Sequence, residues 1–169
     1  MSELLGIEVR PVDSAREAVE GSDIVLAATN ASVPVFEGAW LEPGQHVTSI
    51  VGSNIGLVRS GQLKEKRREL DDRTLGRMDV IAAASRDQAL QDQQGDLYDP
   101  LQAGVIALDD IRDISDILIG AVSGRTTSEQ LTLYKNNAGQ GICDVALAGK
   151  IYARARERGL GMQLPVGGY

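Results

Sequence analysis

Short apolar segments, each followed by residues that favour turns or cap helices, recur along the first half of the chain. Asp23–Thr29, Gln45–Val51 and Asp79–Ala84 are mostly apolar and are short enough to be buried strands. Helix signals lie between such segments: Ser14 and Glu17, for example, have the spacing of a capping box. Strands that alternate with helices form βαβ units, which have parallel strands and right-handed crossovers. The pattern therefore predicts an α/β fold built on a mostly parallel sheet.

The same reasoning places further elements toward both ends of the chain. They are the last turn of a helix at Met1–Gly6, a strand at Ile7–Val12, short helices at 14–20, 72–76 and 85–91, a helix at Asp109–Ile119, a strand at Leu131–Lys135 and a helix at Asp144–Arg158. The helix at 72–76 is expected to be capped by Asp71 or Asp72, and the helix at 85–91 by Ser85.

Composition excludes several classes of protein. The 17 basic and 24 acidic residues leave a net charge of −7, which argues against a general nucleic-acid binder because such binding rests on cationic side chains. No apolar run approaches the ~18 residues of a membrane span, and no signal peptide is visible. One histidine and one cysteine exclude a His/Cys zinc site, and no other metal-ligand spacing is present. Cys143 has no partner for an internal disulfide, which indicates the cytoplasm.

The carboxyl ends of the predicted strands are the first candidate sites. Thr29–Asn30, 52–54 and Ser85–Arg86 follow strands that should all point the same way, so these turns share one edge of the sheet. In open α/β sheets, ligands bind outside that edge. A later predicted strand ends at Lys135, Asn136 and Asn137, which place a charge and two amides there. The alternative for each of these segments is an ordinary polar turn.

Other features indicate structure more than chemistry. The G-x-G-x-x-G fingerprint of a dinucleotide-binding loop is absent, and helix capping explains the glycine pairs at 139–141 and 159–161. His46 has no obvious catalytic partner and is expected to be structural, as is Cys143 on an apolar helix start. The basic run at 64–68 is expected to be a solvated face.

Several segments, taken in order, resemble the ornithine cyclodeaminase/mu-crystallin family over roughly residues 2–162. They are DIVLAATN at 23–30, PVFEGAWLEPGQHV at 34–47, VGSN at 51–54, RELDD at 68–72, DVIAAASRDQAL at 79–90, GDL at 95–97, TLYK at 132–135 and DVALA at 144–148. Each segment is a weak indicator alone, but the ordered set is specific to this family.

The resemblance implies a Rossmann domain that binds NAD or NADP and a second domain for substrate and dimerisation. It also implies hydride transfer at the carbon next to a carboxylate, in an amino acid or a cyclic imine. Family members include ornithine cyclodeaminase, archaeal alanine dehydrogenase, and reductases of ketimines and pyrroline carboxylates. A homodimer and a small amino-acid or imino-acid substrate are therefore expected, with neither nucleic acid nor membrane as a partner.

The resemblance also assigns individual residues. Those expected near the cofactor are Thr29, Asn30, Val51, Gly52, Ser53, Lys135 and Asn136. Asn54 falls where ornithine cyclodeaminase has its catalytic aspartate. Since an asparagine cannot act as a general base, this substitution favours a reductase or dehydrogenase over a cyclodeaminase. Asn136 departs from the family's serine, and the stretch after Asn54 is longer than its equivalent in that enzyme.

The family's glycine-rich loop, its NAD-or-NADP selector and its substrate-binding lysine and arginine would all lie upstream of Met1. We therefore expect a C-terminal half: residues 1–106 as the later part of a Rossmann-like domain, 107–162 as a segment returning to the second domain, and 163–169 as a tail. Such a fragment would be inactive alone, and aggregation-prone or marginally folded. The alternatives are a non-catalytic binding module and a half-enzyme that assembles with a separate N-terminal chain.

Overall fold

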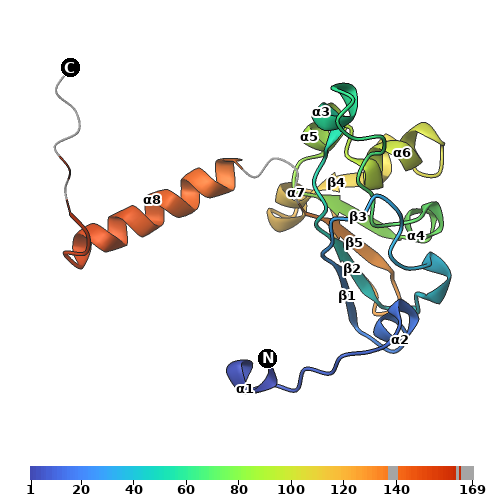
Figure 1. Ribbon diagram of the computed structural model, residues 1–169, viewed down its shortest axis with the longest axis horizontal. Coiled ribbons are helices and arrows are strands. Elements are labelled where there is room, and N and C mark those ends of the chain that lie inside the picture. Colours follow the sequence, from blue (N-terminus) through green and yellow to red (C-terminus); the bar gives the residue numbers. More distant parts are fainter. Residues whose placement is uncertain (137–140, 163, 165–169) are drawn as a thin grey trace. The chain divides into compact units, whose positions relative to one another are not determined.

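The computed structural model describes residues 1–136, 141–162 and 164, and the chain divides into two compact units, Met1–Ala138 and Gly139–Tyr169. The first unit holds a five-stranded, wholly parallel sheet in the order β1-β2-β5-β3-β4 (Figure 1). Its strands are β1 (Ile24–Ala27), β2 (His46–Ser49), β3 (Val80–Ala83), β4 (Ile111–Asp113) and β5 (Thr132–Lys135). The predicted α/β class and parallel sheet are confirmed.

Most of the helices are short. They are α1 (Ser2–Leu5), α2 (Ala15–Val19), α3 (Ile55–Arg59), α4 (Asp72–Gly76), α5 (Arg86–Gln91), α6 (Gly95–Gln102), α7 (Ile114–Leu118) and α8 (Gly141–Glu157), with 3₁₀ turns η1 (Gly38–Trp40) and η2 (Leu108–Asp110). The side chains of Ser14, Asp71 and Ser85 cap α2, α4 and α5, as the sequence predicts. No helix in the described part of the chain is long and apolar enough to cross a membrane.

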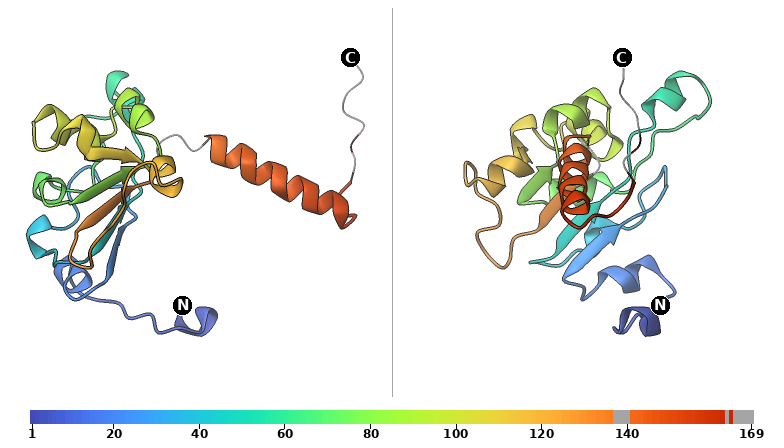
Figure 2. Two further views of the ribbon diagram at one scale, coloured as in Figure 1. Left: turned by 180° about the vertical axis from the view of Figure 1, so that it is seen from behind. Right: turned by 90° about the vertical axis from the view of Figure 1, so that its left-hand side faces the viewer.

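One face of the sheet carries the core. Alternation along the strands places Val25, Val47, Leu133 and Ile81 in adjacent rows of that face, and all four are buried. Apolar residues of the surrounding helices complete the same cluster, among them Val19, Leu75 and Leu97. Figure 2 shows α4 and α6 on one side of the sheet and α7 on the other. The helices on the core side thus bury the apolar rows of the strands and fix the strand ends.

The edge strand β1 shows its second face to solvent. Ile24 and Leu26 are 66% and 61% exposed, although both are large apolar side chains on a strand. Because β1 pairs only with β2 in the described chain, its outer edge keeps unpaired backbone groups. This strand is therefore open to a neighbour both on its edge and on one face.

Two predicted elements are wrong. Ile7–Val12 forms no strand, because no other strand of the described chain lies beside it to satisfy its backbone groups. Asp109–Ile119 is not one helix, since Ile111–Asp113 pairs with β3 as β4 and only Ile114–Leu118 is helical. Here the pairing of this segment with β3 overrides the local helical spacing of its isoleucines.

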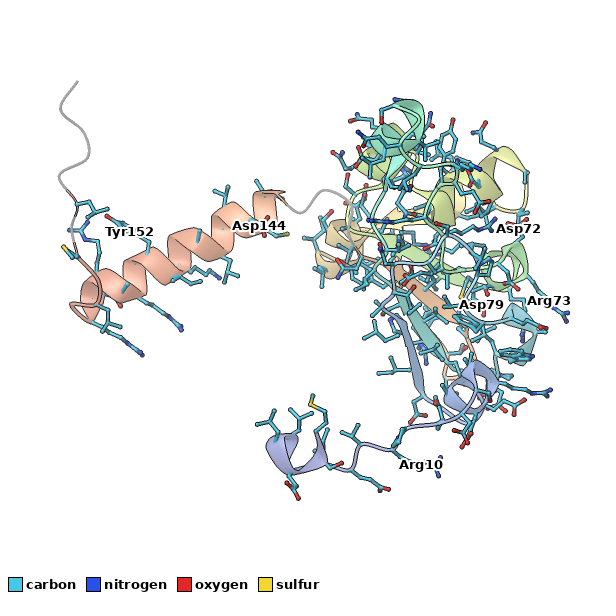
Figure 3. All side chains as sticks on the ribbon, viewed as in Figure 1. Arg10, Asp72, Arg73, Asp79, Asp144 and Tyr152 are labelled. Carbon is cyan, nitrogen blue, oxygen red and sulfur yellow. The ribbon has the colours of Figure 1, made fainter. Side chains whose placement is uncertain are left out.

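The strand predicted near residue 131 is confirmed as β5, which occupies the middle of the sheet. Both β4 and β5 belong to the first unit, and the division by contacts falls between residues 138 and 139. The boundary at 106, between a Rossmann-like part and a segment returning to a second domain, stays a prediction. The second unit contains α8, on which Asp144 and Tyr152 are labelled in Figure 3. Its apolar side chains, such as Ile142, Val145 and Ile151, are exposed.

Candidate functional site

The carboxyl ends of the strands meet at one edge of the sheet. The register aligns Ala27, Ser49, Lys135 and Ala83, the last residues of β1, β2, β5 and β3. The turns that follow these strands, Thr29–Asn30, 52–54 and Ser85–Arg86, therefore lie on the same edge, as predicted. We call this the carboxyl edge.

Lys135 lies beneath the carboxyl edge with its side chain fully buried. Its ammonium donates to Ser49 Oγ at 2.8 Å and to the carbonyl oxygen of Val51 at 2.7 Å, and it lies 3.2 Å from Asp96 Oδ2. These partners use all three of its N–H bonds. The sequence predicts Lys135 near the cofactor, and in the structure its ammonium is engaged by Ser49, Val51 and Asp96.

Glu69 connects the ends of β1 and β2. One carboxylate oxygen accepts from the backbone N–H and the hydroxyl of Thr29. The other accepts from the N–H groups of Ile50 and Val51, at 3.1 and 3.0 Å, and from Ser49 Oγ at 2.8 Å. A single buried carboxylate thus fixes the path of two strand-end turns.

Asp96, near the start of α6, completes this group. Its Oδ1 accepts from the backbone N–H groups of Glu69 and Leu70, at 2.8 and 2.9 Å. Its Oδ2 lies 2.6 Å from Ser49 Oγ, whose single hydrogen serves either Asp96 or Glu69. We call Ser49, Glu69, Asp96 and Lys135 the buried polar cluster.

In the buried polar cluster, hydrogen bonds and opposite charges counteract the effect of burial on the pKa values of the charged groups. Burial lowers the pKa of Lys135, and the charges of Asp96 and Glu69 offset this only in part. For Glu69, burial acts to raise the pKa, but hydrogen bonds from Thr29, Ser49 and Val51 outweigh it, so the pKa is lowered. Two carboxylates therefore face one ammonium, with backbone N–H groups stabilising the remaining negative charge.

Sequence reasoning missed Glu69 and Asp96 as members of a buried cluster. Both lie in segments that carried the family resemblance, RELDD and GDL. The only sequence signal for buried carboxylates was an acidic residue next to a leucine, as in Glu69–Leu70 and Asp96–Leu97. Both leucines are buried in the structure. It did not reveal that residues so distant in sequence meet.

Asn54 follows β2 and is only 5% exposed. Its amide nitrogen donates to the carbonyl of Glu65 at 2.9 Å, and its amide oxygen accepts from the N–H of Arg67 at 2.8 Å. A carboxylate accepts hydrogen bonds but does not donate them, so an ionised aspartate cannot make both contacts. In this chain, Asn54 holds the segment 65–67 against the end of β2.

A polar hollow of about 470 Å³ opens beside this segment. It is lined by Gly52, Ser53, Ile55, Gly56, Arg67 and Asp92. Within the described chain, the N–H groups of Gly52 and Ser53 have no hydrogen-bond partner, and neither does the guanidinium of Arg67. The hollow therefore offers donors at the carboxyl edge.

A second depression, of about 490 Å³, lies on the sheet face opposite the core and is largely apolar. His46 belongs to it, and its ring nitrogens contact Thr132 Oγ1 at 2.7 Å and Thr48 Oγ1 at 3.1 Å. Burial and the nearby Arg125 lower the pKa of His46. The structure is consistent with a structural role, because both nitrogens already have partners. Among the described residues, no His, Cys, Asp and Glu side chains are grouped to hold a metal ion.

The remaining predicted cofactor residues lie at the carboxyl edge in different environments. Thr29 is bound to Glu69, whereas the side chain of Asn30 is exposed. The N–H of Asn136 donates to the carbonyl of Ser49 at 3.0 Å. The carbonyl of Val51 accepts from both Lys135 and Gln94. The structure thus brings the predicted residues to one edge but gives several of them structural partners.

A parallel sheet with crossover helices and polar turns at its carboxyl edge is a Rossmann-like α/β domain. Residues 1–159 match the family model described as the ornithine cyclodeaminase/mu-crystallin family. The chain belongs to this family, which confirms the resemblance seen in the sequence.

Three relatives illustrate the similarity. The chain is 34% identical over 150 residues to an uncharacterized cyclodeaminase of Sinorhizobium fredii, covering 88% of this chain and 41% of that protein. It is 32% identical over 152 residues to a Δ1-pyrroline-2-carboxylate reductase of Bacillus cereus, covering 89% and 43%. The solved Δ1-pyrroline-2-carboxylate reductase of Thermococcus litoralis, in complex with NADH and L-proline, is 33% identical with a TM-score of 0.83, covering 96% and 47%. The chain thus spans less than half the length of these relatives.

Proposed function

We propose that the carboxyl edge binds the nicotinamide part of NAD(H) or NADP(H), in an enzyme that oxidises or reduces a small amino or imino acid. The proposal is supported by the Thermococcus litoralis relative, which is described as a complex with NADH and L-proline. The observation that carries it in this chain is the pair of N–H groups at Gly52 and Ser53, which have no partner among the described residues and lie beside a polar hollow on the carboxyl edge.

The residues present fit a cofactor of this kind. Gly52 has no side chain to keep a ring from its backbone, and its N–H and that of Ser53 suit the oxygen of a carboxamide. The exposed amide of Asn30 follows the neighbouring strand. The buried polar cluster holds both turns from behind, which keeps these donors in place without contacting a ligand.

A bound nicotinamide would supply or accept a hydride. The residues of this chain would orient it. Asn54 supplies no general base, because an amide does not take up a proton near neutral pH. Both polar atoms of Asn54 are also engaged by Glu65 and Arg67. These two facts favour a reductase or dehydrogenase over a cyclodeaminase.

The proposal is tested by NMR titration of isotopically labelled chain with NADH and NADPH, up to about 10 mM, since a partial site binds weakly. We expect the amide signals of Asn30, Gly52 and Ser53 to shift saturably. The variant G52V should lose these shifts, because its side chain covers the backbone, while V33A, a change at an exposed position, should keep them. Shifts confined to other residues, or none at all, would contradict the proposal.

We further propose that β1 pairs with a strand supplied by the remainder of a full-length protein or by a separate N-terminal half, and that the complete assembly is a homodimer. In the part of the chain that the structure describes, the outer edge of β1 is unpaired, and Ile24 and Leu26 are exposed, which supports a neighbour at this place. Mixing the chain with a polypeptide that covers the other half of a relative should give a stable complex and raise the affinity for NADH. Failure of the two parts to associate would count against this arrangement.

A further inference from the structure

We propose that His46, Thr132 and Arg125 form an acid-sensitive latch on the sheet face opposite the core. While His46 is neutral, the latch holds the segment 124–128 against the sheet, and protonation of His46 releases this segment. His46 and Thr132 are paired as the first residues of β2 and β5, and Arg125 lies in the connection between α7 and β5. The latch is therefore at the amino ends of these strands, away from the proposed cofactor site at the carboxyl edge.

The direction of each hydrogen bond in the latch follows from the chemistry of its members. Thr132 Oγ1 lies 3.0 Å from Arg125 Nη2 and 2.7 Å from His46 Nδ1. A guanidinium only donates, so the oxygen of Thr132 accepts from Arg125, and the hydroxyl donates its single hydrogen to Nδ1. Nδ1 is therefore unprotonated. The neutral ring carries its proton on Nε2, which donates to Thr48 Oγ1 at 3.1 Å.

A proton on Nδ1 disrupts this arrangement. The imidazolium donates at both nitrogens, so His46 and Arg125 then direct two N–H groups at the one oxygen of Thr132. The hydroxyl hydrogen of Thr132 loses its acceptor on the ring, and two positive charges share one small side chain. Arg125 is exposed and finds water as a partner when it leaves, whereas the backbone of His46 is fixed in a strand. Arg125 is therefore the member that gives way.

The surroundings of His46 favour the neutral ring at neutral pH. Burial lowers the pKa of His46, and the positive charge of Arg125 lowers it further. The other titratable residues that line the same depression are Asp23 and Tyr134, while α7 and β3 contribute only apolar side chains to its lining. Asp23 forms no ion pair with His46 or Arg125 in the described part of the chain. The latch is thus closed at neutral pH and opens in acid.

Other contacts hold the chain on both sides of the segment 124–128. The carbonyl of Ser123 accepts from the guanidinium of Arg112, and the carbonyl of Glu129 accepts from the N–H of Gly44 at 2.9 Å. Neither contact involves a group that titrates near neutral pH. The response to acid is therefore confined to the residues between these two contacts.

The latch also determines the shape of the depression on this face. Besides Thr132, Arg125 Nη2 contacts the carbonyl of Gln45 at 3.2 Å, so one guanidinium joins the segment to the starts of both β2 and β5. Gly124 and Arg125 form part of the wall of the depression, whose volume is about 490 Å³. Release of Arg125 withdraws that wall, so the depression is wider in acid than at neutral pH.

The experiment is NMR on the full 169-residue chain, labelled with ¹⁵N, between about pH 5 and 8. His46 is the one histidine of the sequence, so its ring signals are identified without ambiguity. At neutral pH, two-bond ¹H–¹⁵N correlations should show a neutral ring with its proton on Nε2. The ring should titrate with a midpoint below about 6.5. The backbone amides of 124–128 should shift with the same midpoint, whereas the amide of Gly56 on α3 should not.

Variants separate the latch from a general effect of acid. H46Q has a side chain that takes up no proton in this range, so the amides of 124–128 should lose their response to pH. T132V removes the shared hydroxyl and should uncouple these amides from the ring. R125M removes a positive charge within about 6 Å of the ring and should raise its midpoint by about half a pH unit. R73M removes an exposed arginine of α4 and should leave the midpoint unchanged.

The proposal is overturned if the neutral ring carries its proton on Nδ1, or if the amides of 124–128 stay fixed while the ring titrates. An unchanged response of these amides in H46Q would assign it to another group, such as Asp23, and would also overturn the proposal. If T132V does not fold, R125M and H46Q answer the question through the same signals. None of these measurements uses NADH, so their outcome is independent of the cofactor site.

Discussion

Lys135 and Asp96 form a fully buried ion pair, with 3.2 Å between Nζ and Oδ2, that joins the end of the central strand β5 to the start of α6. The pair shares Ser49 with Glu69, so four polar side chains occupy the space under the carboxyl edge. Because each is held by partners on a different element, the cluster sets the positions of the turns that follow β1 and β2.

The first prediction concerns the buried ammonium. K135M leaves Asp96 and Glu69 buried without a cation, and removal of one partner of a buried pair costs about 3–5 kcal/mol. Urea unfolding followed by circular dichroism should show a correspondingly lower midpoint. The control E20Q disrupts the exposed Arg16–Glu20 pair and should change stability by no more than about 0.5 kcal/mol. A K135M midpoint equal to that of the wild type would contradict the central role of the cluster.

The second prediction concerns acid. The pKa of Glu69 is lower in the folded protein than in the unfolded chain, where it is about 4.3. Its contribution to stability is therefore complete above that unfolded value and is lost as the pH falls toward the lower, folded value.

Urea unfolding at a series of pH values tests this directly. E69Q should be less stable at neutral pH and should lose less further stability than the wild type below about pH 4.3. E3Q changes an exposed glutamate of α1 and should reproduce the wild-type profile. Parallel pH profiles for E69Q and the wild type would show that the Glu69 carboxylate does not carry this dependence.

The third prediction concerns the close contact of Gly95 with the carbonyl of Arg67. G95A would place a Cβ 2.3 Å from a backbone oxygen, which forces the 65–69 segment or α6 to move. A loss of about 1–3 kcal/mol is expected, as for other overpacked sites. G56A adds a Cβ that meets nothing within 4 Å and should be neutral or slightly stabilising. Thermal unfolding of both variants checks this difference.

The fourth prediction concerns the exposed edge strand β1. I24K replaces a side chain that is 66% exposed on an edge with unpaired backbone groups, and lysine at such edges opposes strand addition. Light scattering on incubation should fall relative to the wild type. V33K adds the same charge at an exposed position outside the sheet and should reduce scattering less. Equal reductions would attribute the effect to net charge and not to the edge.

The sequence by itself determined the parallel sheet, the helix caps and the edge at which the site lies. Apolar runs such as Asp79–Ala84 are local, and so are the hydrogen bonds that the side chains of Ser14 and Ser85 accept from nearby N–H groups. Both can therefore be recognised without the fold. Parallel strands then bring their carboxyl ends together whatever the details of packing. The segments that indicated the family needed only their order along the chain.

The tertiary structure decided what the polar residues at that edge do. Lys135 meets Ser49 across 86 positions of sequence and Glu69 meets Thr29 across 40, and no local pattern encodes such pairings. The strand at Ile111–Asp113 arises only because β3 is beside it, and Ile7–Val12 remains outside the sheet for want of such a neighbour. Whether a polar side chain faces a ligand or supports the backbone behind it depends on burial and on distant partners, which exist only once the chain has folded.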